Sequence, residues 1–61
     1  MERILYTLAE AAELLGLSKG MVVKLATNGE LPTIKLGRSR RVTAGALQAY
    51  VQRAVEAAAA R

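Results

Sequence analysis

Leu15-Gly16-Leu17-Ser18 decides the fold, because this stretch ends one helical segment and begins another without a spacer. Gly16 stands where a helix C-terminus calls for a left-handed residue, and Ser18 can cap the following helix with its side-chain oxygen. The second segment closes on Asn28-Gly29, and Pro32 then forbids further helix. The sequence therefore predicts two short helices joined by a three-residue turn, the arrangement called helix-turn-helix.

The segment before the turn is predicted to be a helix over residues 8–15. Its apolar residues recur at the i, i+3, i+4 and i+7 spacing of a buried stripe: Leu8, Ala11, Ala12 and Leu15. Thr7-Leu8-Ala9-Glu10 has the form of a capping box, so we interpret Glu10 as part of the cap. Ile4-Leu5-Tyr6, just before it, is β-prone but too short for an independent strand.

The second helix is predicted to turn a small, basic face outward. Leu17 and Val22 flank the Ser18 cap at the spacing of a hydrophobic staple, which fixes the angle at which the helix leaves the turn. Val22, Leu25 and Ala26 form its inward stripe. At about 100° per residue the opposite face carries Gly20, Lys24 and Thr27, flanked by Lys19, Met21, Val23 and Asn28.

A basic hairpin is predicted after Pro32. Residues 33–36 alternate in the period-2 manner of a half-buried strand, Gly37-Arg38-Ser39 reads as the turn, and Arg41-Val42 continues the return strand. Lys35 and Arg41 alternate outward. Arg40 falls on the side of Val42, so it can either turn out at the tip or pack its stem against the core.

Thr43 is predicted to cap a third helix, with Val42 and Leu47 as its staple. Apolar residues keep a 3-4 spacing to its end, at Leu47, Tyr50, Val51, Ala54, Val55 and Ala58. At 1.5 Å per residue this helix reaches about 25 Å, more than so small a domain needs to cover. We therefore expect one domain over residues 1–61, with residues 57–61 projecting or frayed.

Composition narrows the function classes. With 61 residues, no Cys and no His, the chain lacks the usual metal ligands, nucleophilic thiols and general bases, so we expect no enzyme activity, no cofactor and no metal site. No apolar stretch approaches the roughly 20 residues of a membrane span, which makes a cytoplasmic protein the default. The net charge of +4 favours a polyanionic partner.

The distribution of charge points to nucleic acid. Residues 35–41 hold four cations and no acid, and such a cluster is best tolerated where an external anion neutralises it. The two aromatic residues, Tyr6 and Tyr50, fit core-edge positions and offer no stacking platform, so duplex DNA is favoured over single strands. The predicted contact residues are Ser18, Lys19, Gly20, Met21, Val23, Lys24, Thr27, Lys35, Arg38, Ser39, Arg40 and Arg41.

Several segments together resemble a known family: residues 8–18, Asn28-Gly29-Glu30-Leu31-Pro32, Ile34-Lys35-Leu36-Gly37-Arg38 and Arg41-Val42-Thr43. Over about residues 5–52 the chain is similar to the excisionase-type winged helix-turn-helix domains related to the MerR regulators. The resemblance implies a mainly α fold of three helices plus a β-hairpin wing. It implies a recognition helix in the major groove, bearing Lys19, Gly20, Met21 and Lys24, and a wing with Arg38 and Arg40 or Arg41 on the adjacent minor groove or backbone.

The resemblance also implies a function. The family includes phage and mobile-element excisionases, also called recombination directionality factors, which bend DNA in the bacterial host cell, bind side by side and bias an integrase towards excision. Gly20, Met21 and Val23 stand where relatives often have polar or aromatic residues. Part of the specificity is therefore expected from DNA shape.

Three other readings stay open. The first is a small transcriptional regulator with the same fold, dimerising through the third helix. The second is a protein-interaction module that docks on a recombinase through Val51, Ala54, Val55 and Ala58. The third, a membrane-surface binder, is disfavoured because the cations concentrate in a hairpin rather than along a helix.

Overall fold

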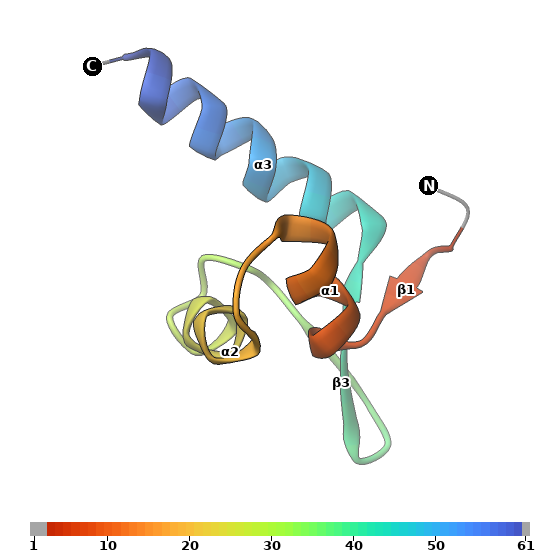
Figure 1. Ribbon diagram of the computed structural model, residues 1–61. Coiled ribbons are helices and arrows are strands. Elements are labelled where there is room, and N and C mark those ends of the chain that lie inside the picture. The colour runs from red at the N-terminus through yellow and green to blue at the C-terminus, as the bar shows by residue number, and fades with distance from the viewer. Residues whose placement is uncertain (1–2, 61) are drawn as a thin grey trace.

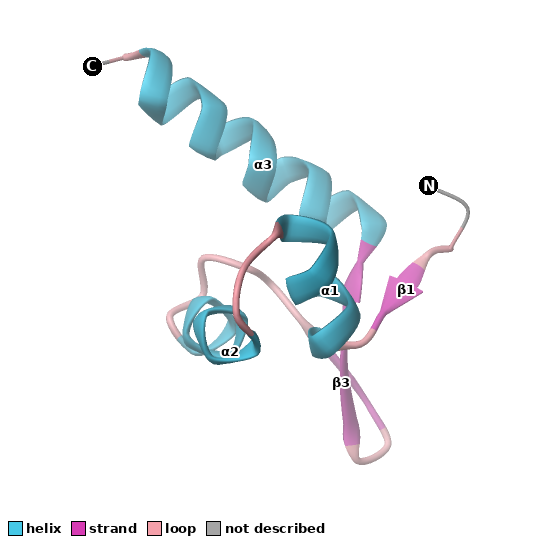
Figure 2. Cartoon of the chain, viewed as in Figure 1, coloured by secondary structure: helices cyan, strands magenta, loops and turns pink. Residues whose placement is uncertain are grey.

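A computed structural model describes residues 3–60, and within them the chain forms three helices and three strands. Figures 1 and 2 show α1 and α2 beside a small sheet, with α3 leading away from it. The elements in chain order are β1 (Leu5–Tyr6), α1 (Leu8–Leu15), α2 (Lys19–Thr27), β2 (Ile34–Leu36), β3 (Ser39–Thr43) and α3 (Ala44–Ala59). The predicted fold class, three helices with a β-hairpin, is confirmed.

Each helix begins at the predicted cap. The hydroxyls of Thr7, Ser18 and Thr43 accept hydrogen bonds of 3.0, 3.1 and 3.0 Å from the backbone N–H three residues further on. At Thr7 the box is complete, because the Glu10 carboxylate accepts the backbone N–H of Thr7 at 2.8 Å. These short polar signals set the starts of α1, α2 and α3.

The turn between α1 and α2 has the predicted left-handed glycine. Gly16 has φ +72°, its N–H bonds to the Glu13 carbonyl at 3.2 Å, and the Leu17 N–H bonds to the Ala12 carbonyl at 2.9 Å. This pair of bonds is the Schellman motif, which satisfies the last carbonyls of α1. The chain therefore reaches the Ser18 cap directly, and only three residues separate the end of α1 from the start of α2.

The sheet has one strand more than the sequence indicated. Its order is β1-β3-β2, with Leu5 opposite Thr43 and Tyr6 opposite Val42 in an antiparallel pair. The Ile4-Leu5-Tyr6 lead is too short to stand alone, yet it completes the sheet because β3 offers a second free edge. That pairing joins residues nearly forty positions apart, and no local pattern announces it.

The hairpin turn is shorter than predicted. Leu36 pairs with Ser39, so Ser39 begins β3 and only Gly37-Arg38 forms the loop. Gly37 has φ +62°. Within residues 3–60 only glycines have a positive φ, so the φ of Arg38 is negative. A positive φ followed by a negative φ is typical of a type II′ turn. Two-residue turns of this kind match the twist of the strands they join.

The shorter turn corrects the predicted orientation of Lys35 and Arg41. A three-residue turn would place Arg41 opposite Lys35, whereas the observed register pairs Lys35 with Arg40 and Ile34 with Arg41. Residues directly opposite one another share a face of the ribbon, and a shift of one residue exchanges the faces. Lys35 and Arg41 therefore lie on opposite faces, and Arg40 lies beside Lys35.

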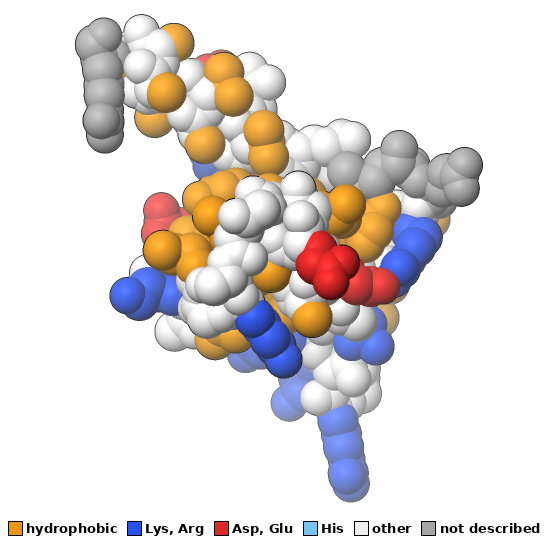
Figure 3. Space-filling model, viewed as in Figure 1, with side chains coloured by type: hydrophobic (Ala, Val, Ile, Leu, Met, Phe, Trp, Pro, Cys, Tyr) orange, Lys and Arg blue, Asp and Glu red, His pale blue; other side chains and the backbone are white. Residues whose placement is uncertain are grey.

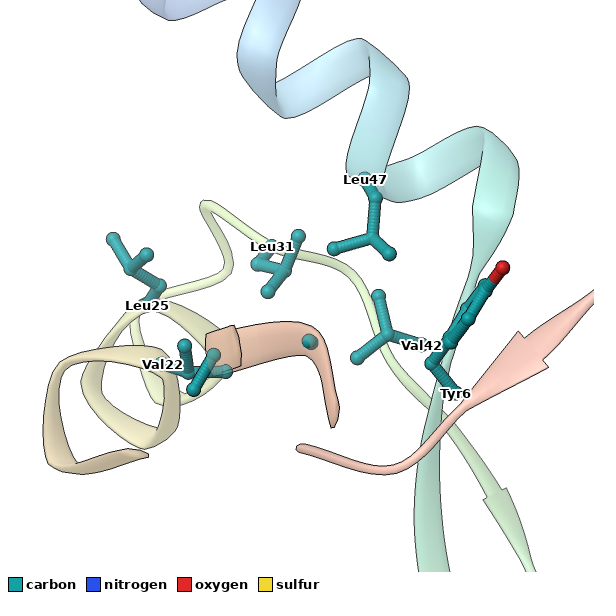
Figure 4. Packing of buried hydrophobic residues seen from close by; sticks show 8 residues of the cluster. Tyr6, Val22, Leu25, Leu31, Val42 and Leu47 are labelled. Carbon is teal, nitrogen blue, oxygen red and sulfur yellow. The ribbon is translucent and has the colours of Figure 1, made fainter. Parts of the chain in front are cut away.

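The core joins all the layers (Figure 4). Its buried members come from every element except β2, and they are Tyr6, Ala11, Ala12, Val22, Leu25, Leu31, Val42 and Leu47. Both members of each predicted staple pack here, with Leu17 partly buried at the edge. Tyr6 departs from expectation, because it is a core residue rather than an edge residue. Leu31, in the loop after α2, is fully buried although no sequence pattern predicted it.

The distal part of α3 extends from the body (Figure 1). Every residue from 51 to 60 is exposed, and the helix continues to Ala59 with Ala60 as its cap. Arg61, the last residue of the segment expected to project, lies outside the described residues. Among residues 3–60 no helix combines the length and apolar character that a membrane crossing requires.

Glu10 makes an ion pair in addition to its cap. Two bonds of 2.6 Å join its carboxylate oxygens to the Arg3 guanidinium, which also lies 4.9 Å from the centre of the Tyr6 ring. Hydrogen bonds from Arg3 and from the Thr7 backbone and hydroxyl lower the Glu10 pKa to about 2, and the same pairing raises the pKa of Arg3. The carboxylate thus stabilises the start of α1 only while ionised.

We expect Glu10→Gln to lower the melting temperature at pH 7 and to remove part of its acid dependence. Because folding lowers the Glu10 pKa, its stabilising effect is full above the unfolded value near 4.5 and is lost as pH falls towards 2. Thermal unfolding followed by circular dichroism should show the two proteins converging between these pH values. A constant difference down to pH 2 would contradict this account. Glu13→Gln, on the exposed face of α1, is the control.

Candidate nucleic-acid interface

The predicted contact residues lie on two elements, α2 and the β2–β3 hairpin. On the face drawn in Figure 3, most Lys and Arg side chains lie over these elements in the lower half of the view, and the acidic side chains lie higher. In Figure 1 the hairpin extends below α1, past the lower ends of α1 and α2, with α2 to its left. The arrangement presents a helix and a β-loop at one end of the molecule, away from the tip of α3.

The packing of α2 fixes which of its residues face solvent. Val22 and Leu25 are buried and Ala26 is half-buried, as the stripe predicted. The remaining predicted positions are all exposed: Ser18, Lys19, Gly20, Met21, Val23, Lys24 and Thr27. This face therefore combines two ammonium groups with small and apolar side chains.

The two hydroxyls on this face are partly committed to the backbone. Ser18 Oγ accepts the N–H of Met21, so its own proton stays available to a phosphate oxygen. The Thr27 hydroxyl donates to the Val23 carbonyl at 2.9 Å, which leaves its oxygen as an acceptor. The capacity of α2 for direct hydrogen bonds to base edges consequently rests mainly on Lys19 and Lys24.

The cations of the hairpin differ in exposure. Lys35 and Arg38 are exposed, with Arg38 in the turn itself, while Ser39 and Arg41 are half-buried. The Arg41 Nη1 donates to the Arg40 carbonyl at 3.1 Å. Lys35 and Arg38 make no side-chain hydrogen bond to any residue of the described part of the chain, so their charges are available at the tip.

The structure settles the orientation of Arg40. Its side chain is exposed, and Nη1 donates to the Thr33 hydroxyl at 3.0 Å instead of packing its stem into the core. The bond spans the two strands of the hairpin, because Arg40 and Thr33 lie on the face shared with Lys35. Arg40 is thereby held in place while its remaining N–H groups stay free to donate.

Within residues 3–60 the cations of α2 and the hairpin form no salt bridge. Between residues 3 and 60 the only salt bridge joins Arg3 to Glu10, far from these elements in sequence. Unneutralised cations so close together repel one another, and a phosphate backbone relieves that repulsion. Chemically, the surface is suited to binding an extended polyanion.

Arg53 follows the hairpin cations in the sequence without an intervening acidic residue, but it has a different role. Its Nη2 donates to the backbone carbonyl of Glu30 at 2.6 Å and so ties α3 to the loop after α2. Sequence reasoning missed this contact because a backbone carbonyl acceptor leaves no residue signature. No group of three or more His, Cys, Asp or Glu side chains comes together as a metal site anywhere in residues 3–60.

Comparison with known proteins gives a consistent family match. A family model described as "Helix-turn-helix domain" matches residues 5–55. Two Mycobacterium tuberculosis proteins, from strains CDC 1551 and H37Rv, are each named "Putative DNA-binding protein"; both are 51% identical over 43 residues, covering 70% of this chain and 55% of theirs. A Saccharopolyspora erythraea protein named "Probable excisionase" is 36% identical over 53 residues, covering 87% of this chain and 54% of its own length.

These matches extend over only part of the length of each relative. The chain spans about half the length of the curated relatives it matches. No solved structure gives a significant match. The matched residues include both α2 and the hairpin, so the comparisons bear on these two elements directly.

We expect Gly20→Ala to raise stability and weaken binding to duplex DNA. A methyl group at Gly20 meets nothing within 4 Å, so it should stabilise α2 by about 0.5–1 kcal/mol. On the outward face the same methyl group holds the helix backbone away from DNA. Hydrogen bonds to charged groups are worth about 1.5–3 kcal/mol, so losing one weakens binding about tenfold or more.

Gly45→Ala is the matched control, because Gly45 also occupies the second position of its helix with open space around it. It should raise the melting temperature without changing affinity for DNA. Thermal unfolding and fluorescence anisotropy with a labelled duplex measure the two effects. Equal DNA affinity of both variants would show that α2 does not approach DNA closely at this position.

Proposed function

The chain belongs to the helix-turn-helix domain family, a family of DNA-binding domains, and on that premise we propose that it binds duplex DNA through α2 and the hairpin without catalysing a reaction. The single observation that carries this proposal is the set of cations on both elements that lack any carboxylate partner within residues 3–60. In the proposed complex α2 enters the major groove and the hairpin lies on the adjacent minor groove or its phosphates. Sequence preference comes partly from DNA shape, because Gly20, Met21 and Val23 offer few hydrogen bonds.

We further propose an excisionase role, in which the protein bends DNA beside an attachment site in a bacterial cytoplasm and biases an integrase towards excision. The similarity to the Saccharopolyspora erythraea protein named "Probable excisionase" supports this choice. Copies bound side by side would leave footprints as direct repeats. A transcriptional regulator that dimerises would instead protect symmetric half-sites about one helical turn apart.

The salt dependence of binding tests the electrostatic basis. Neutralising about five phosphates predicts a slope near −4 to −5 in a plot of log affinity against log salt concentration. Lys24→Ala and Arg38→Ala should each reduce the size of that slope by about 1, because each removes one phosphate contact. Fluorescence anisotropy with a duplex from the DNA neighbouring the protein's own gene gives the affinities.

Arg3→Ala is the charge-matched control for both variants. It lowers the net charge by the same amount, but Arg3 is paired with Glu10 away from α2 and the hairpin. Its slope should equal that of the unaltered protein. A slope near zero for the unaltered protein would refute duplex binding through these cations. Equal slopes for all the variants would place the contacts elsewhere.

A second contact surface is proposed on α3, with an integrase as its partner. Two adjoining depressions of about 250 and 380 Å³ share Leu15 and Val51 and run from the end of α1 along α3. The larger one, of about 380 Å³, is lined by Leu15, Leu17, Tyr50, Val51, Ala54, Val55 and Ala58. We call these residues the α3 apolar surface. An apolar surface on a projecting helix is suited to a protein partner rather than to DNA.

Ending the chain after Arg53 separates the two surfaces. The removed segment contains Glu56 and Arg61, so the net charge stays at +4, and the Arg53 bond to Glu30 is retained. Affinity for duplex DNA should therefore change less than about threefold, within the range of neutral surface changes. Complex formation with the integrase, followed by co-sedimentation on attachment-site DNA, should be lost.

Val55→Ser in the full-length chain checks that the loss reflects contact rather than shortening. It leaves the length of α3 unchanged and replaces an exposed side chain of the α3 apolar surface. The variant should weaken the complex while leaving its melting temperature unchanged. An integrase complex that survives both changes would exclude this surface as the point of contact.

A further inference from the structure

The hairpin has two chemically different faces. The register that puts Lys35 beside Arg40 puts Leu36 beside Ser39 and Ile34 beside Arg41 on the opposite face. Ile34 and Leu36 thus form an apolar strip along the strand β2 on the face that also carries the half-buried Arg41, while Lys35 and Arg40 lie on the other face. The strip ends at the turn, where Leu36 directly precedes Gly37-Arg38.

Packing within the chain does not account for this strip. Leu36 is 50% exposed and Ile34 is 42% exposed. Neither belongs to the core cluster nor to the partly buried residues packed against it. A threonine at either position would suit a strand edge equally well. The hairpin therefore carries a large apolar group, Leu36, one residue from the exposed cation of the turn, Arg38, and outside the core.

Resting on the proposed binding of duplex DNA, we infer that Leu36 is an apolar wedge that enters the minor groove beside Arg38 and bends the duplex. Proteins that bend DNA from the minor groove combine cationic side chains with apolar ones inserted between base steps. Arg38 and Leu36, separated by one glycine, supply both kinds of group at the end of a narrow ribbon. Bending then follows from the partial unstacking of the base step that receives Leu36.

Ile34 has a supporting place in this arrangement. It lies two residues from Leu36 on the same face, which is about 7 Å at 3.4 Å per residue. That spacing sets Ile34 nearer the mouth of the groove, against the sugars, while Leu36 occupies the deeper position. The cationic face with Lys35 and Arg40 is left to contact the phosphates of one strand.

The test compares Leu36→Ala with Leu14→Ala on a duplex of about 30 base pairs carrying the protein's footprint and dyes at both ends. Leu14, on α1, is 55% exposed and lies on neither α2 nor the hairpin, so it is the matched control. With Leu36→Ala at saturation, the distance between the dyes should approach that of straight DNA, and affinity should fall about fivefold from the lost apolar burial. Leu14→Ala should bend DNA like the unaltered protein.

Two further measurements distinguish the loss of the wedge from a destabilised hairpin and from a lost phosphate contact. Leu36→Met keeps an apolar side chain of similar volume and should restore bending, which a change in hairpin stability alone would not predict. The salt slope of Leu36→Ala should match that of the unaltered protein, because no phosphate contact is removed.

Each contrary result has a distinct meaning. Unchanged bending by Leu36→Ala, alongside weakened binding by Arg38→Ala, would overturn the wedge and leave the proposed function standing. Unchanged bending on one site with weaker cooperative binding on longer DNA would overturn the wedge and assign the strip to a neighbouring copy. Failure of the unaltered protein to bind duplex DNA would overturn the proposed function, and the wedge with it.

Discussion

The burial of Val42 in the central strand is the constraint on which the rest of the structure depends. Val42 is fully buried, and β3, which carries it, pairs with β1 on one edge and with β2 on the other. One end of β3 passes directly into the Thr43 cap of α3, and the other end forms the hairpin. The packing of Val42 and the pairing of β3 on both edges thus hold the strand from which the hairpin extends on one end and α3 on the other.

Local signals were enough to predict the three helices, because each signal acts over about four residues. A cap such as Ser18, a left-handed Gly16 and a staple such as Leu17 with Val22 are all complete within one turn of chain. Pairing between distant segments leaves no such trace. The joining of β1 to β3, the burial of Leu31 in a loop without periodicity and the two-residue turn after Leu36 depend on the assembled core.

The same division holds for the candidate interface. Helical periodicity correctly predicted that Lys19 and Lys24 turn outward, because Val22 and Leu25 are buried on the other side. It could not predict which cations would be used within the chain. Arg53 bonds a carbonyl and Arg40 bonds a threonine hydroxyl, and both partners are set by tertiary placement rather than by sequence spacing.

The different side chains of α2 and of the β2–β3 hairpin give the proposed mode of recognition a physical basis. The exposed face of α2 has two ammonium groups and no guanidinium, and its one amide, Asn28, lies at the C-terminal cap. In the proposed complex this face therefore positions the protein more than it selects a sequence. Selection then has to come from the energy of deforming DNA, which depends on sequence even where no base is touched. In the proposed complex the hairpin delivers that deformation, because Val42 anchors β3 in the core and β3 pairs with the strands on both sides. In the proposed mode of recognition the small basic helix and the two-faced hairpin are therefore complementary: the helix holds the duplex, and the hairpin bends it.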